Sequence, residues 1–133
     1  MTDAIINLSS QTIILAIVLV SFAFRMKNNY KAHVATMAVA VVFALVVASI
    51  GIAGFSDSNY MQTLTNPTLN MVSFVSHAIL GIASFASGII LLALLLIDKA
   101  IAARSDLIAK VTPILWVVTY IVGILFLVIL RII

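Results

Sequence analysis

The stretch LNMVSFVSHAILGIASFASGIILLALLLI, residues 69–97, decides the fold because it contains no Asp, Glu, Lys or Arg. An α-helix needs about 20 predominantly apolar residues to cross roughly 30 Å of hydrocarbon. The stretch therefore predicts a membrane-spanning helix that is long enough to tilt or to extend beyond the bilayer. A histidine in its first half, His77, is the residue whose presence needs an explanation.

The composition of the whole chain agrees with a membrane environment. Hydrophobic residues make up 65% of the 133 residues, charged residues make up 8%, and the mean hydropathy is +1.33. Soluble domains carry about 25% charged residues, so this chain is expected to be an integral membrane protein. The absence of cysteine excludes disulfides and thiolate metal sites. The positions of the basic residues explain the net charge of +3, and we expect no nucleic-acid partner.

Three further apolar stretches accompany the first. Together they predict four transmembrane helices at about residues 8–26, 31–55, 67–98 and 107–131, in a single domain that covers residues 1–133. None alternates strictly between apolar and polar residues, which favours an all-α bundle in up-down-up-down order over a β-barrel. No basic residue precedes the first stretch, so we expect it to be retained rather than cleaved as a signal peptide.

Two prolines mark helix boundaries in this prediction. Asn66 followed by Pro67 is typical of an N-cap with proline at the first helical position. Pro113 either starts the last helix in the same way or interrupts it one turn after its start.

The basic residues predict the orientation. The C-terminus holds only Arg131. The other six Lys and Arg residues lie in or beside two of the expected loops: Arg25, Lys27, Lys31, Lys99, Arg104 and Lys110. Loops with an excess of Lys and Arg stay in the cytoplasm. We therefore expect loops 25–31 and 98–110 to be cytoplasmic and both termini to lie outside, in the plasma membrane of a prokaryote. The expected role of these residues is to set the topology and to contact lipid headgroups.

A seam of small and polar residues runs along the third apolar stretch, with spacings of four, four, three and four: Ser73, His77, Gly81, Ser84 and Gly88. Such spacings place residues on one helical face, and small residues let helices approach closely. The second stretch offers a matching face: Ala40, Ala44, Ala48 and Gly51, following His33 and Met37. We expect the two helices to pack through these faces and to bury His77.

The two histidines have an ordinary explanation and a functional one. Ionisable groups inside a membrane are costly, and a hydrogen bond to a neighbouring helix is the ordinary reason for keeping one. Alternatively, either histidine binds a cofactor, haem or copper. His33 and Met37 lie one turn apart and together provide an imidazole and a thioether that suit copper(I). On the outer side, Met61 and Met71 are the methionines nearest to His77.

The spacing along the helices separates the two histidines. His33 opens the second helix at the cytoplasmic boundary, whereas His77 precedes Asp98 by about 21 residues. At about 1.5 Å per residue, His77 lies roughly 30 Å from that boundary. The two imidazoles are therefore not expected to share one metal ion or one haem.

No catalytic constellation is visible in the sequence. The chain has no glutamate, and its four aspartates all fall in expected termini, loops or helix ends: Asp3, Asp57, Asp98 and Asp106. Proton pumping normally requires an intramembrane carboxylate, and no phosphate-binding loop or nucleophile triad is present. We expect no enzymatic activity and no catalytic residues.

Short motifs in three of the predicted helices resemble a known family: Lys31, His33 and Met37; His77 to Leu80; and Ala109, Lys110, Thr112, Trp116 and Gly123. The chain is similar to small four-helix membrane proteins associated with haem-copper terminal oxidases, which include cytochrome oxidase maturation proteins. It departs from the family pattern at Ser105, where a histidine is common, at Pro113, which adjoins Thr112, and at Val118, where a tyrosine is usual.

The resemblance implies a role beside a respiratory haem-copper oxidase. We therefore expect a non-catalytic accessory subunit or assembly factor of a membrane metalloenzyme complex, either that oxidase or another membrane oxidase or copper monooxygenase. The partners would be the lipid bilayer and other membrane subunits. A haem- or copper-binding chaperone that uses His33 and Met37, or His77, is the alternative. A small transporter is disfavoured because only the His77 seam is polar.

Overall fold

The computed structural model describes residues 2–56, 67–97 and 106–132. Within these ranges the chain forms four α-helices: α1 (Thr2–Met26), α2 (Tyr30–Ser56), α3 (Pro67–Ile97) and α5 (Asp106–Ile132). The prediction of an all-α bundle is confirmed. α3 begins at Pro67 as predicted. α1 begins six residues earlier than the hydrophobic pattern indicated, because polar residues interrupt the apolar pattern in its first turns.

Each helix is long and apolar enough to cross a membrane. The apolar spans are Leu8–Met26, Tyr30–Ile50, Phe74–Ile97 and Asp106–Leu125. All four helices expose large apolar side chains on the outer surface of the bundle, among them Ile13, Val42, Ile82 and Ile121. A water-facing surface of this kind is unfavourable, whereas hydrocarbon solvates it well. The structure is that of a multi-pass membrane bundle.

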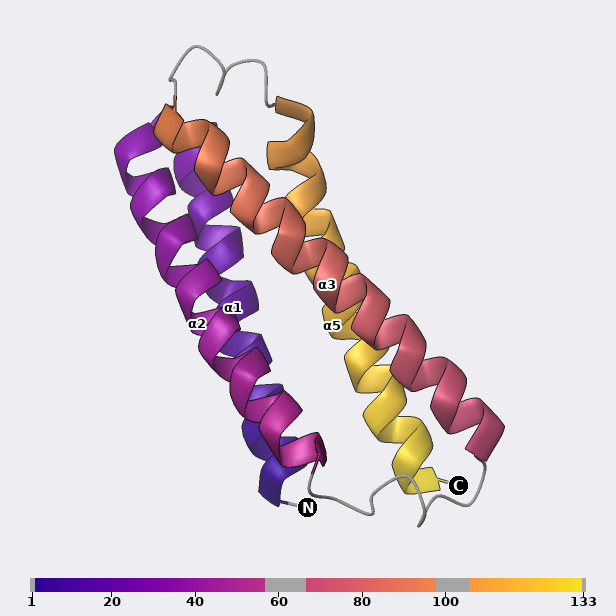
Figure 1. Cartoon of the computed structure of the whole chain (residues 1–133). Helices are drawn as coiled ribbons and strands as arrows, with labels where there is room; N and C mark the ends of the chain where they lie inside the picture. The colour runs from indigo at the N-terminus through magenta and orange to yellow at the C-terminus, as the bar shows by residue number, and fades with distance from the viewer. Residues whose placement is uncertain (1, 57–66, 98–105, 133) are drawn as a thin grey trace.

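The helices alternate in direction and form two hairpins, α1–α2 and α3–α5 (Figure 1). Packing is most extensive within each hairpin, weaker between α1 and α5, and weaker still between α2 and α3. α1 begins and α5 ends at the same end of the bundle, where the two hairpins diverge (Figure 1). The opposite end, which we call the basic end, carries Arg25, Lys27, Lys31 and Lys110.

A two-asparagine turn joins α1 to α2 at the basic end. Asn28 has a left-handed backbone with φ of 57°, and its N–H donates to the Arg25 carbonyl at 2.9 Å. The Asn29 N–H donates to the Phe24 carbonyl at 2.9 Å, which completes a Schellman motif. The Asn29 side chain then accepts from the Ala32 N–H at 3.2 Å and caps α2. One asparagine ends α1 and the next begins α2, which explains the tight hairpin.

Two clusters form the core. At the level of the basic end, Met37 of α2 packs with Leu91 and Leu95 of α3 and Ala109 of α5. The second cluster brings α1 and α2 together, with Trp116 of α5 against it: Ile14, Val18, Ala40 and Ala44. The two alanines allow the close approach of α1 and α2.

Pro113 lies inside α5, and its side chain is buried. The prediction that it starts this helix is wrong, because α5 begins at Asp106. A proline within a helix provides no N–H for the carbonyl one turn earlier. The neighbouring Thr112 is fully buried, and its hydroxyl donates to the Ile108 carbonyl at 2.8 Å.

Candidate functional site

His33 of α2 and Ser21 of α1 form a reciprocal hydrogen-bonded pair, which we call the latch. The Nδ1 of His33 lies 2.8 Å from the Ser21 carbonyl oxygen and 2.8 Å from Ser21 Oγ, and Ser21 Oγ donates to the His33 carbonyl at 3.0 Å. Because a carbonyl only accepts, this arrangement assigns the imidazole proton to Nδ1. Both residues are almost completely buried. The latch fixes the ring and the register of the α1–α2 hairpin.

The other nitrogen of His33 is placed differently. Nε2 is buried and has no hydrogen-bond partner among the described residues. With the proton on Nδ1, Nε2 carries a lone pair, which is the state in which imidazole binds a metal. Met37 is 2% exposed and lies one turn further along α2, packed in the first core cluster. The predicted pair thus occupies the bundle interior.

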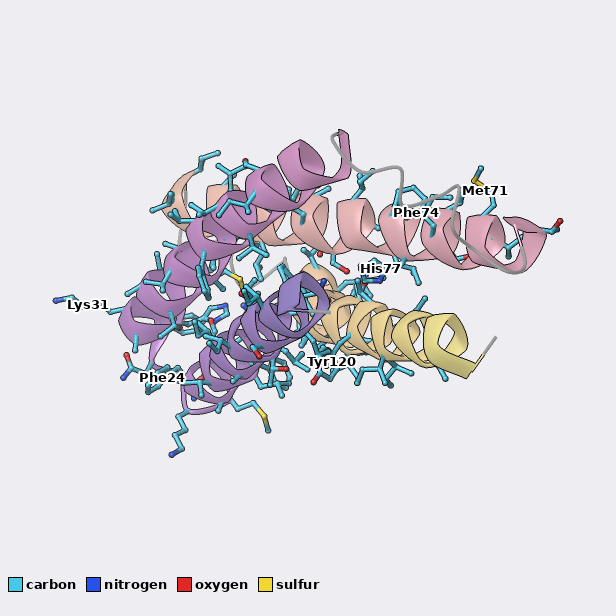
Figure 2. The ribbon with its side chains drawn as sticks, turned by 90° about the horizontal axis from the view of Figure 1, so that it is seen from below. Phe24, Lys31, Met71, Phe74, His77 and Tyr120 are labelled. Carbon is cyan, nitrogen blue, oxygen red and sulfur yellow. The ribbon has the colours of Figure 1, made fainter. Side chains whose placement is uncertain are left out.

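His77 is held between α3 and α5. Its ring hydrogen-bonds to the backbone carbonyl of Thr119, and its Nδ1 has no partner among the described residues. Figure 2 shows the side chain in the space between these two helices. A Cβ placed on Gly123 would lie 2.9 Å from His77 Cε1 and 3.5 Å from Gln11 Oε1. Gly123 therefore leaves the space that the imidazole fills.

The two histidines lie at different levels of the bundle. His33 bonds to Ser21, and His77 lies near Gln11, which is ten residues earlier on α1. Ten residues of helix correspond to about 15 Å along the axis. This separation is shorter than the sequence estimate, because His33 pairs with Ser21 inside α1 and not with the end of that helix. It is still too long for a shared ion or haem. Met71 is exposed and projects away from the bundle (Figure 2), and Met61 lies outside the described residues.

The predicted α2–α3 seam forms only in part. Gly88 does approach α2, since a Cβ placed there would lie 3.3 Å from Val41 Cγ2. Ser84 instead hydrogen-bonds to Thr119 Oγ1 of α5 at 2.7 Å. The expected burial of His77 against α2 is likewise corrected, because its neighbours lie on α5 and α1. The reason is that α3 packs most extensively against α5, and its described contacts with α2 lie toward the basic end (Figure 1).

The remaining seam residues follow from this geometry. A Cβ on Gly81 would have no atom within 4 Å, and Ala48 is exposed. Ala40 and Ala44 are buried, but in the cluster with α1. The surroundings of Ser73 and Gly51 lie outside what the structure describes.

Several contacting residues were not singled out from the sequence. Ser21 and Thr119 provide the hydrogen bonds to the histidines, and Tyr120 bonds to Thr12 Oγ1 of α1 at 2.8 Å. Serine and threonine are frequent in transmembrane helices, where they can bond to their own carbonyls. A helical-face analysis of the last helix, on which Thr112, Thr119 and Gly123 share one side, would have found Thr119.

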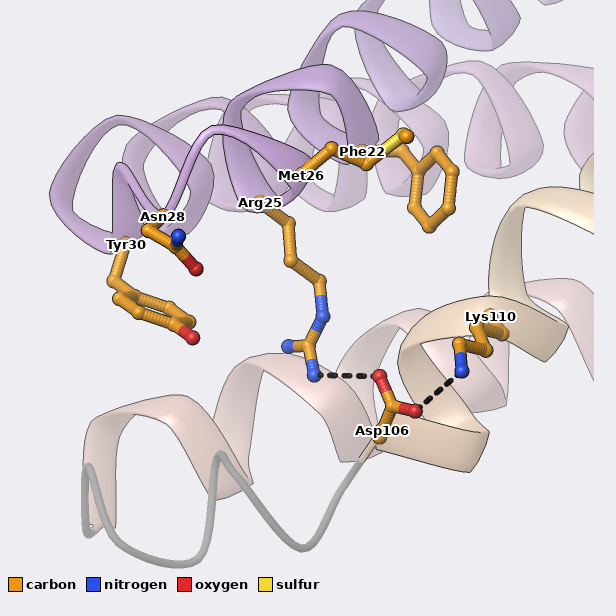
Figure 3. Close-up of a pocket in the computed structure, with 7 residues that line it drawn as sticks. All are labelled: Phe22, Arg25, Met26, Asn28, Tyr30, Asp106 and Lys110. Carbon is orange, nitrogen blue, oxygen red and sulfur yellow. Dashed lines mark hydrogen bonds and ion pairs between the residues drawn. The ribbon is translucent and has the colours of Figure 1, made fainter.

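The basic end contains a pocket of about 320 Å³ between α1 and α5. Arg25 Nη2 lies 3.5 Å from Asp106 Oδ1, and Lys110 pairs with the other oxygen of the same carboxylate (Figure 3). The Arg25 side chain is only 10% exposed, whereas Lys27 and Lys31 are exposed. Lys99 and Arg104, also expected at this end, lie outside the described residues.

Within residues 2–56, 67–97 and 106–132, no group of three or more His, Asp or Glu side chains is arranged to hold a metal ion. A ligand at either histidine would thus depend on one imidazole and, at His33, on the nearby thioether. No family model, curated protein or solved structure matches the chain.

Proposed function

We propose that the chain is a non-catalytic accessory subunit or assembly factor of a membrane metalloenzyme complex. The observation that supports this proposal is that the facing sides of α2 and α3 are left uncovered beyond the point where the two helices touch. Beyond the contact between Val41 and Gly88, Leu45 and Ala48 continue the α2 face, and Gly81 continues the α3 face. Leu45 and Ala48 are exposed, and nothing lies within 4 Å of a Cβ on Gly81.

This open face suits a neighbouring transmembrane helix. Helices associate in membranes through close packing at small residues, because lipid supplies no hydrophobic driving force between them. Gly81 and Ala48 lie on helices that diverge toward the end opposite the basic end (Figure 1), and the proposed partner helix packs against these two positions. The proposal that the partner is a metalloenzyme rests on the family resemblance of motifs in α2, α3 and α5. A respiratory haem-copper oxidase is the first candidate.

The test is purification of the native complex in mild detergent, followed by mass spectrometry and visible absorption spectroscopy. We expect oxidase or monooxygenase subunits in stoichiometric amounts. Gly81→Leu should fill the open face and reduce the recovery of these subunits. Ala86→Leu is the matched control, because Ala86 is an exposed residue of α3 that points about 140° away from Gly81. A chain that purifies alone, or equal recovery from both variants, would contradict the proposal.

A copper-carrying chaperone is the second candidate, and the orphaned Nε2 of His33 favours it. The residues present fit a single soft ion better than haem, because a side chain 1% exposed leaves no face for a porphyrin. His33 Nε2 and the Met37 thioether would hold the ion, while the Ser21 carbonyl fixes the tautomer. Bound copper(I) would supply a transferable cargo rather than a reaction centre.

Titration of the purified chain with copper(I) tests this second candidate. We expect one equivalent to bind, and both His33→Ala and Met37→Leu to abolish binding, whereas His77→Ala retains it. Unchanged binding in His33→Ala would exclude His33 as a ligand, and a native complex that lacks this copper would favour the accessory role.

A further inference from the structure

We propose that the pocket at the basic end binds the phosphate of an anionic phospholipid headgroup. The pocket lies between the last turn of α1 and the first turn of α5 (Figure 3). Its volume of about 320 Å³ is within the range of small-molecule sites and accommodates a phosphate with a glycerol. This proposal is independent of the identity of any protein partner.

The charges of the pocket favour an anion. Arg25 and Lys110 both pair with Asp106, so the described lining of the pocket places two cations around one carboxylate. The distance of 3.5 Å from Arg25 Nη2 to Asp106 is long compared with about 2.8 Å for a strong charge-assisted bond. The Arg25 side chain is nine-tenths buried and lines the pocket.

The shape of the pocket favours a lipid over a free anion. Phe22 and Met26 supply an apolar wall from α1, and Tyr30 contributes an aromatic ring with a hydroxyl (Figure 3). Tyrosine at this position is typical of the membrane–water interface. Inorganic phosphate would use only the cations, whereas a phospholipid also covers the apolar wall with its glycerol and upper acyl chain.

The position along the bundle agrees with this ligand. Arg25 lies in the last turn of the apolar span of α1, and Asp106 begins that of α5, so the pocket lies at the level expected for the headgroups. Basic pockets between transmembrane helices at this depth are suited to acidic headgroups. The exposed Lys27 and Lys31 at the same end add a diffuse positive potential.

Native mass spectrometry of the full chain, released from micelles that contain phosphatidylglycerol and phosphatidylcholine, tests the proposal. We expect one phosphatidylglycerol to be retained in preference to phosphatidylcholine. Arg25→Gln should weaken its binding about tenfold, the equivalent of one charge-assisted hydrogen bond. Asp106→Asn should strengthen binding, because it removes the competing carboxylate. Lys31→Gln is the matched control: it removes the same charge from an exposed side chain that projects away from the bundle (Figure 2).

Three results would overturn the proposal. Equal losses in Arg25→Gln and Lys31→Gln would mean that surface charge alone attracts the lipid. Inorganic phosphate that displaces phosphatidylglycerol at equal concentration would identify a small-anion site instead. Weaker binding in Asp106→Asn would show that the carboxylate holds the ligand. This last variant keeps the test decisive if Arg25→Gln fails to fold, because its expected effect has the opposite sign.

Discussion

The two histidines provide the most informative comparison in this bundle. His33 is 1% exposed and forms a reciprocal pair with Ser21, with bonds in both directions between side chain and backbone. His77 is half-buried, makes a hydrogen bond to one carbonyl and rests against Gly123. The sequence pattern had made His77 the central residue and had placed His33 at the membrane boundary.

The difference shows that the position of a residue along its helix does not by itself determine how deeply its side chain is buried. His33 lies only three residues into α2, but the two-asparagine turn brings the end of α1 directly against it. His77 lies well inside α3, and its described neighbours are Gly123 and Thr119 of α5, with Gln11 of α1 close by. Burial of a polar side chain in a four-helix bundle depends on how many helices meet at its level.

The largest expected effect is that of removing each imidazole in turn. His33→Ala empties a fully buried site and leaves the Ser21 carbonyl and hydroxyl with fewer partners, so it should lower the free energy of unfolding by about 3 kcal/mol. His77→Ala should cost about 1 kcal/mol, because its site is partly open and one bond is lost. Reversible unfolding in mixed detergent micelles measures both values.

Ser21→Ala serves as the control for the latch. It removes the hydroxyl but keeps the carbonyl that accepts from Nδ1, so it should cost less than His33→Ala. An equal or larger cost for His77→Ala than for His33→Ala would break the comparison and would place the structural centre of the bundle at α3–α5.

A second experiment tests the packing of His77 directly. In Gly123→Ala the new methyl group would lie 2.9 Å from His77 Cε1. Either the imidazole or α5 must then move, at a cost of about 2 kcal/mol. Gly81→Ala is the matched control on α3, since no atom lies within 4 Å of its Cβ position. It should be neutral or stabilising, because alanine is the better helix former.

The pair of variants also allows a double-mutant cycle. In the His77→Ala background, Gly123→Ala should lose most of its cost, because the remaining neighbour, Gln11 Oε1, is at an ordinary 3.5 Å. Additive costs would show that Gly123 is required for some other contact of α5.

The sequence predicted the four helices well but their partners poorly. Long apolar stretches and Pro67 define where the helices lie, because hydrocarbon leaves the backbone no other hydrogen bonds. The faces of α3, by contrast, carry small or apolar residues on most sides, and its periodicity does not distinguish α2 from α5 as the neighbour of Ser84. That choice depends on Thr119 and Gly123, which lie on a different helix more than thirty residues away in sequence.

The sequence also did not predict the salt bridge at the basic end. Arg25 and Asp106 are far apart in sequence, and each alone looks like an ordinary interfacial charge. Only the packing of α1 against α5 brings them together and buries the Arg25 side chain. A charge count establishes which end is basic, but the pocket requires the helix arrangement.

The smallest expected effect concerns the hydrogen bond that links α3 to α5. Ser84 Oγ and Thr119 Oγ1 are 2.7 Å apart, and each hydroxyl also reaches its own helix, Ser84 to the Leu80 carbonyl and Thr119 to the Leu115 carbonyl. One hydroxyl therefore donates across the interface while the other donates along its helix. A cycle of Ser84→Ala and Thr119→Val should give a coupling of about 0.6 kcal/mol, typical of interhelical bonds in membranes. We expect a smaller coupling than for His33 and Ser21, because that pair has three short contacts and full burial, whereas the Ser84–Thr119 bond competes with two backbone carbonyls. A larger coupling for Ser84 and Thr119 would contradict this order.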